Sequence, residues 1–155
     1  HITEKATYMI WEDGRYVVKI KGSNNFTCLV LTDINGRYEP SCLNEQAMES
    51  VFPIYEIQAN YLEKGKSIEF VNQQIDKLFR NGKILSPKPG TLVYMMSSKN
   101  KYYDHIKEKL VMVPPHIMLY FPKLSNDMLG FNGKEGLPMF YNEYPHLSVV
   151  HILTQ

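Results

Sequence analysis

Two cysteines lie symmetrically on either side of one turn signal in this chain of 155 residues. Residues 26–32 have the composition of a β-strand, and Asn35-Gly36 marks the turn that follows them. Opposed residues of an antiparallel hairpin have numbers with a constant sum, and Cys28 and Cys42 are equally far from Asn35. A tight hairpin therefore brings their side chains opposite each other, which predicts a Cys28–Cys42 disulfide. Two buried free thiols are the alternative.

The predicted disulfide indicates the compartment, because disulfides persist where the surroundings are oxidising. Apolar runs such as 28–31 and 117–121 are much shorter than the ~18–20 residues that cross a bilayer. Residues 1–5 contain no apolar signal region. We therefore expect a secreted or periplasmic protein with no transmembrane segment, whose signal peptide is absent from this sequence. A cytosolic protein is the alternative.

The charge balance limits the classes of partner. Lys and Arg number 17 and Asp and Glu number 16, which gives a formal net charge of +1. Proteins that bind nucleic acids by neutralising phosphates carry an excess of positive charge, so we expect no nucleic-acid partner. Hydrophobic residues make up 44% and charged residues 21% of the chain, which excludes a disordered solvating segment. At this length, residues 1–155 are expected to form a single domain.

Alternating polar and apolar residues predict β-strands in the first 43 residues and again after residue 90, with helices between them. Asn44 is typical of a helix N-cap, Pro53 of the first residue of a second helix, and Ser67 of the N-cap of a third. The expected strands are residues 6–11, 16–21, 26–32, 91–97, 110–113, 116–121 and 148–153. This order predicts an α+β fold: an antiparallel sheet, made of an N-terminal meander and C-terminal strands, with two or three helices grouped on one face.

The most informative segment is the expected strand of residues 116–121. Because side chains alternate along a strand, His116, Met118 and Tyr120 face the same side. An imidazole and a phenol on a buried face need hydrogen-bond partners. We interpret this face as part of a pocket in which His116 acts as acid or base. The alternative is a core layer in which a backbone carbonyl satisfies His116.

A second group of residues completes the expected pocket. Tyr94 and Met96 share one face of the strand 91–97, and they lie beside His116 if the two strands are neighbours. The glycine-rich loop 130–138 carries Phe131 and is expected to act as a lid. The catalytic candidates are His116, Tyr94 and Tyr120, and the ligand-binding candidates are Met96, Met118 and Phe131.

The leading functional hypothesis is an exported protein that binds a small-molecule ligand and needs no cofactor. The first alternative is a small hydrolase or lyase that uses His116 as general acid or base. The second alternative is a protein that binds copper or another metal, because Met95, Met96, Met112 and Met118 cluster around His116 and soft thioethers suit Cu(I). No motif fixes a reaction, since the chain lacks a nucleophile elbow, a phosphate loop and a dinucleotide fingerprint.

The other histidines give weaker signals for a metal site. His1 with its terminal amine and a second histidine would form a copper brace, but no pattern places that second histidine. His146 and His151 are five residues apart, so they face opposite sides of a regular strand, which argues against shared ligation.

Distinctive strings occur in both halves of the chain. Those of the first half are Ala6-Thr7-Tyr8-Met9-Ile10-Trp11 with Gly14 and Tyr16-Val17-Val18, Gly22-Ser23-Asn24, Phe26-Thr27-Cys28-Leu29-Val30 and Glu39-Pro40-x-Cys42. Those of the second half are Tyr94-Met95-Met96-Ser97, Pro115-His116-x-Met118-x-Tyr120-x-Pro122 and Gly130-Phe131. Together they resemble a family of uncharacterised secreted bacterial proteins. The resemblance covers nearly the whole chain, and it implies export and a disulfide without attaching an activity to the motifs.

Overall fold

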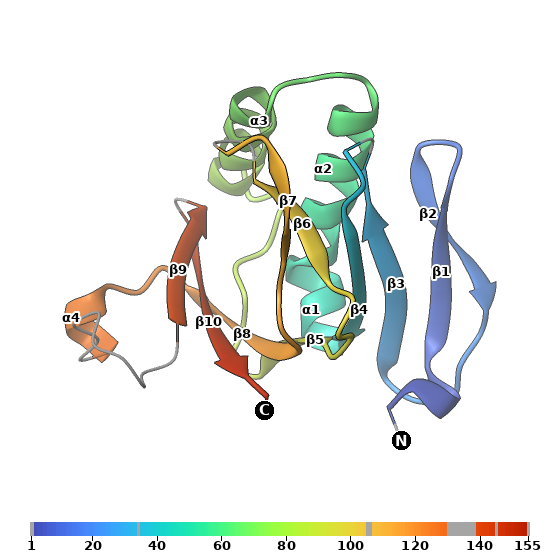
Figure 1. Cartoon of the computed structure of the whole chain (residues 1–155). Coiled ribbons are helices and arrows are strands. Elements are labelled where there is room, and N and C mark those ends of the chain that lie inside the picture. The colour runs from blue at the N-terminus through green and yellow to red at the C-terminus, as the bar shows by residue number, and fades with distance from the viewer. Residues whose placement is uncertain (1, 34, 105–106, 130–138, 145, 155) are drawn as a thin grey trace.

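A computed structural model describes residues 2–33, 35–104, 107–129, 139–144 and 146–154 (Figure 1). The strands are β1 (Thr7–Glu12), β2 (Arg15–Ile20), β3 (Phe26–Thr32), β4 (Tyr38–Asn44), β5 (Thr91–Met95), β6 (Lys101–Asp104), β7 (Lys109–Met112), β8 (His116–Pro122), β9 (Met139–Tyr144) and β10 (Leu147–Leu153). The helices are the 3₁₀ turn η1 (Thr3–Lys5), α1 (Glu45–Ser50), α2 (Phe52–Glu63), α3 (Ile68–Arg80) and the short α4 (Asn126–Leu129). The predicted α+β class is confirmed.

The described strands form one sheet, which is mostly antiparallel. Its main path runs β2-β1-β3-β4-β5-β8-β10-β9, and the β6–β7 hairpin joins it through β4. Helices α1, α2 and α3 come between the two halves of the sheet in sequence, as the alternation of residues predicts. Strands β6 and β9 were not expected, because residues 101–104 are strongly polar and residues 139–144 follow a glycine-rich segment.

The expected N-terminal meander is wrong in one respect, because β3 does not pair with β2. It lies on the other side of β1 and runs parallel to it, with Tyr8 beside Cys28. The connection therefore crosses the end of β1, where the backbone N–H of Gly22 donates to Thr7 Oγ1 at 3.1 Å. A Cβ atom on Gly22 would lie 2.2 Å from the carbonyl carbon of Ala6, so only glycine permits this close crossing.

The helix boundaries follow from capping residues, as predicted. The side chain of Asn44 accepts a hydrogen bond from the backbone N–H of Ala47 at the start of α1. Pro53 lies in the first turn of α2, where its missing N–H costs nothing. Ser67 accepts from the backbone N–H of Phe70 at the start of α3.

The predicted Cys28–Cys42 disulfide is present, with an S–S distance of 2.04 Å. Strands β3 and β4 form the expected hairpin, and its register places Cys28 directly opposite Cys42. The carboxylate of Asp33 organises the turn by accepting hydrogen bonds from the backbone N–H groups of Asn35 and Arg37. Side chain, turn and register thus agree, which is why a local signal was sufficient to predict the bond.

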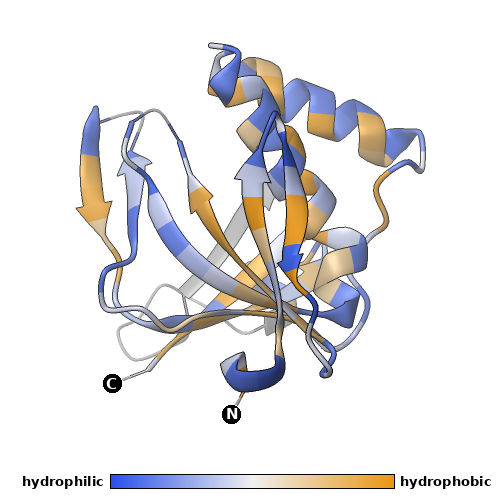
Figure 2. Ribbon diagram, turned by 90° about the vertical axis from the view of Figure 1, so that its right-hand side faces the viewer, coloured by the Kyte–Doolittle hydropathy of each residue, from blue (hydrophilic) through white to orange (hydrophobic). Residues whose placement is uncertain are grey.

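The two faces of the sheet have different neighbours. On one of them, which we call the helix face, buried apolar side chains pack against α1, α2 and α3. This core includes Leu31, Leu43, Val51, Ile54, Ile75, Val93, Met118 and Val149. Figure 2 shows the helices on one side of the curved strands and the N-terminal turn η1 on the other. The opposite face, here the outer face, has no helix from α1 to α3 packed on it.

Tyr16 of β2 is buried, and its hydroxyl donates to the carbonyl oxygen of Val30 on β3 at 3.1 Å. Burial raises the pKa of Tyr16 to about 12, so this phenol stays a hydrogen-bond donor throughout the neutral range.

None of the helices within the described ranges combines the length and the apolar character needed to cross a bilayer.

Candidate functional site

The two strands that carry the predicted site are neighbours, as expected. β5 pairs antiparallel with β8, with Tyr94 opposite Ile117. Opposed residues point to the same face of a sheet, so Tyr94 lies on the opposite face from His116. The predicted single surface is therefore wrong. The helix-face residues are His116, Met118 and Tyr120, and the outer-face residues are Tyr94 and Met96.

His116 lies in the packed interior. Its side chain is buried, and its ring Nδ1 donates to the carbonyl oxygen of Pro114 at 2.8 Å. Because a carbonyl oxygen can only accept, Nδ1 carries a proton in this arrangement. The arrangement matches the alternative in which a backbone carbonyl satisfies the imidazole.

A second histidine lies beside His116, and no pattern in the sequence predicted it. The ring of His151, on β10, stacks on that of His116 with centroids 4.9 Å apart and planes 5° apart. Burial, together with the smaller electrostatic effect of the neighbouring His116, lowers the pKa of His151 to about 4. His146 precedes β10, so His146 and His151 do not lie on one strand as expected. The Nε2 of His146 donates instead to Asp76 Oδ1 on α3 at 2.7 Å.

Acid should destabilise the fold through His151. Its pKa is about 4 in the folded chain and near 6.5 in an unfolded one, so the unfolded state binds the proton first as the pH falls from 6.5 to 4. We expect the free energy of unfolding to fall by about 1–3 kcal/mol across this interval, after allowing for the partial exposure of the ring. Urea unfolding at several pH values measures the change. His151→Phe keeps a ring and should flatten the profile; an equal loss in both proteins would contradict this assignment.

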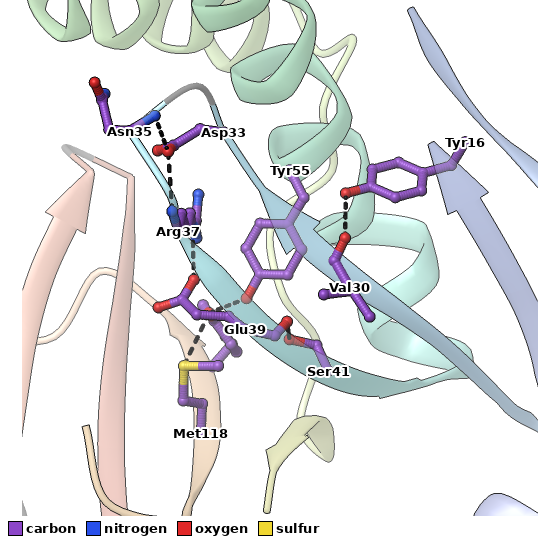
Figure 3. A network of polar contacts seen from close by, with 10 residues as sticks. Tyr16, Val30, Asp33, Asn35, Arg37, Glu39, Ser41, Tyr55 and Met118 are labelled. Atoms are coloured by element: carbon purple, nitrogen blue, oxygen red, sulfur yellow. Dashed lines mark hydrogen bonds and ion pairs between the residues drawn. The ribbon is translucent and has the colours of Figure 1, made fainter. Parts of the chain in front are cut away.

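The phenol of Tyr120 belongs to a buried polar network on the helix face. Its hydroxyl is 2.8 Å from that of Tyr55 on α2 and donates to the sulfur of Met118 at 3.4 Å. Figure 3 shows Tyr55 and Met118 converging on this point, with Glu39 beside them. Glu39 is also buried and pairs with Arg37. These contacts join α2 to β8 and explain why polar groups are tolerated at this depth.

The outer face carries a hollow with a volume of about 400 Å³, here called the outer hollow. Outward-facing residues of four adjacent strands line it: Tyr8 and Ile10, Cys28 and Val30, Pro40 and Cys42, and Tyr94 and Met96. Ile2, which precedes η1, and Thr3, its first residue, also belong to the lining. The disulfide thus belongs to the lining, and the exposed atoms of the lining are almost wholly apolar.

Two residues of the predicted pocket line this hollow, whereas the residues expected beside them do not. Tyr94 and Met96 both line it, and the ring of Tyr94 packs edge-on against Phe26 at 5.9 Å between centroids. Neither His116 nor Tyr120 contributes to it. Phe131 and the expected lid 130–138 lie outside the described residues. The missed signal was that β1, β3 and β4 carry apolar residues at both alternating sets of positions, so apolar side chains cover the outer face as well as the helix face.

The expected soft-metal cluster is divided between sites. Met95 lies opposite His116, whereas Met96 lies on the outer face and Met112 is exposed on β7. The rings of His116 and His151 are stacked in parallel planes, and the lone pair of an imidazole nitrogen lies in the plane of its ring. The two lone pairs therefore do not converge on one ion. Among the described residues, no three His, Cys, Asp or Glu side chains gather as a metal site. His1, the start of the hypothetical brace, lies outside them.

A scan against protein-family models, a search of curated proteins and a search of solved structures each found no match to this chain. The case for function therefore depends on the geometry of the chain itself.

Proposed function

We propose that this chain is an exported binding protein that holds a small, largely apolar ligand in the outer hollow. The observation that carries the proposal is the hollow itself, about 400 Å³ in volume and lined by apolar side chains. Ligand pockets have volumes of roughly 300–1,000 Å³ and are mainly apolar with a few polar groups. The outer hollow agrees with this description in both size and chemistry.

The lining residues favour binding over turnover. Among the described residues that line the hollow there is no His, Asp, Glu, Lys or Arg, so a general acid or base of the usual kind is lacking there. The polar groups of the lining are hydroxyls, such as those of Tyr94 and Ser97. A hydroxyl can both donate and accept a hydrogen bond, which suits it to orienting a ligand.

Export is supported by the disulfide that forms part of the lining. Cys28 is buried and paired with Cys42, and no free cysteine occurs in the chain. Disulfides of this structural kind are rare in reducing compartments. A ligand bound over the disulfide would therefore be met outside the cytosol, at the cell surface, in the periplasm or in the medium.

A titration with a neutral fluorophore tests the proposal. N-phenyl-1-naphthylamine is apolar, carries no charge and brightens when it leaves water. We expect its fluorescence to rise and to saturate at one probe per chain, because the outer hollow has the size and the apolar lining for one such probe. A signal that grows in proportion to probe concentration, without saturation, would contradict a specific site.

A further inference from the structure

A second hollow opens beside the first at the N-terminal end of the sheet. It has a volume of about 520 Å³, and its lining shares Thr3 and Tyr8 with the outer hollow. The two hollows are therefore adjacent. Their chemistry differs, because the second lining includes Lys5 and Lys21 and is half polar, whereas the first is apolar. We call this second hollow the lysine groove.

The backbone holds the two lysines in place. The carbonyl oxygen of Lys5 accepts hydrogen bonds from the backbone N–H groups of Ser23 at 2.8 Å and Asn24 at 3.1 Å. Lys21 directly precedes Gly22, where the chain crosses the end of β1 in close contact with Ala6. These contacts hold the backbone at both lysines, which line the groove beside the crossing at Gly22.

The groove has an excess of positive charge. Lys5 and Lys21 are exposed, and neither ammonium group forms an ion pair with any residue in the described ranges. Glu4 contributes the only carboxylate of the described lining, so two ammonium groups stand against one carboxylate. An anionic group entering here gains attraction from two lysines and repulsion from one glutamate.

We infer that the ligand is a single-chain anionic amphiphile, with its apolar chain in the outer hollow and its acid group at Lys5 and Lys21. This inference rests on the proposed function, since it needs the outer hollow to bind the chain. Thr3 and Tyr8 line both hollows, so a molecule long enough to extend past these two residues can occupy both. The hydroxyl of Tyr8 donates to the carbonyl oxygen of Thr3 at 2.8 Å, which holds the shared wall together.

Paired ligands that differ only in the head group test the inference. Decanoate and decanol have the same chain, and both are titrated against bound N-phenyl-1-naphthylamine at neutral pH and low salt. We expect decanoate to bind about fivefold more tightly than decanol, because each exposed charge pair contributes modestly. The double variant Lys5→Gln/Lys21→Gln should lose this preference and keep its affinity for decanol.

The control carries the same charge change elsewhere. Lys77→Gln/Lys83→Gln alters two exposed lysines at and just after the C-terminal turn of α3, away from both hollows, and should leave both affinities unchanged. Equal affinities for decanoate and decanol in the parent chain would overturn the inference and leave the proposed function standing. Displacement of the probe by neither ligand would instead count against the proposed function. If Lys5 and Lys21 governed co-sedimentation with anionic phospholipid vesicles but not decanoate binding, a membrane surface would replace the free amphiphile.

Discussion

Val30→Trp is expected to lower the affinity for the neutral fluorophore at least tenfold. Val30 lies in the lining of the outer hollow and is 36% exposed, so the added indole would extend into the space that the ligand needs. Its backbone carbonyl, which accepts from Tyr16, is unaffected by the change. Stability should therefore stay within about 1 kcal/mol of the parent chain, as for other surface substitutions. Fluorescence titration and urea unfolding measure the two quantities separately.

The control for this variant lies on the same face. Ile152 on β10 is 40% exposed and is opposite Ile117 on the outer face, but it does not line the hollow. Ile152→Trp adds the same indole at similar exposure and should leave the affinity unchanged. If Val30→Trp bound the probe as tightly as the parent chain, the outer hollow could not be the binding site.

Removing the disulfide with Cys28→Ala/Cys42→Ala is expected to cost about 3 kcal/mol of folding free energy. The bond joins residues separated by 14 positions, and closing a loop of about this length restricts the unfolded chain by that amount. The loss is large compared with the total stability of a typical domain, about 5–15 kcal/mol. Urea unfolding of both proteins at neutral pH measures it.

A reducing agent separates the cross-link from other effects of the substitutions. Adding a dithiol should bring the parent chain close to the stability of Cys28→Ala/Cys42→Ala and should leave that variant unchanged. A difference below about 1 kcal/mol between oxidised and reduced parent chain would show that the cross-link contributes little, and the argument for export would lose its main support.

The parts of the fold that sequence reasoning predicted are those set by local signals. Asn44, Pro53 and Ser67 act through backbone groups within a few residues of themselves, so the helix ends were readable. The β3–β4 hairpin has a short turn, and counting outward from Asn35 was enough to pair Cys28 with Cys42.

The parts that could not be predicted depend on pairing between distant strands. Tyr94 is opposite Ile117, and a shift of one residue would have put it on the face of His116, as first expected. Nothing local distinguishes these two registers, because both faces of β5 and β8 are largely apolar. The contact between His151 and His116 could not be predicted for the same reason, because it depends on the pairing of β10 with β8.

Carbon-13 NMR of the methionine methyl groups tests the binding site most directly, because the two faces of the sheet carry different methionines. Met96 lines the outer hollow, whereas Met95 and Met118 are buried on the helix face. On addition of N-phenyl-1-naphthylamine, the Met96 resonance should shift and saturate while those of Met95 and Met118 stay in place. Shifts at Met95 and Met118 with Met96 unmoved would place the ligand beside His116 and contradict the account.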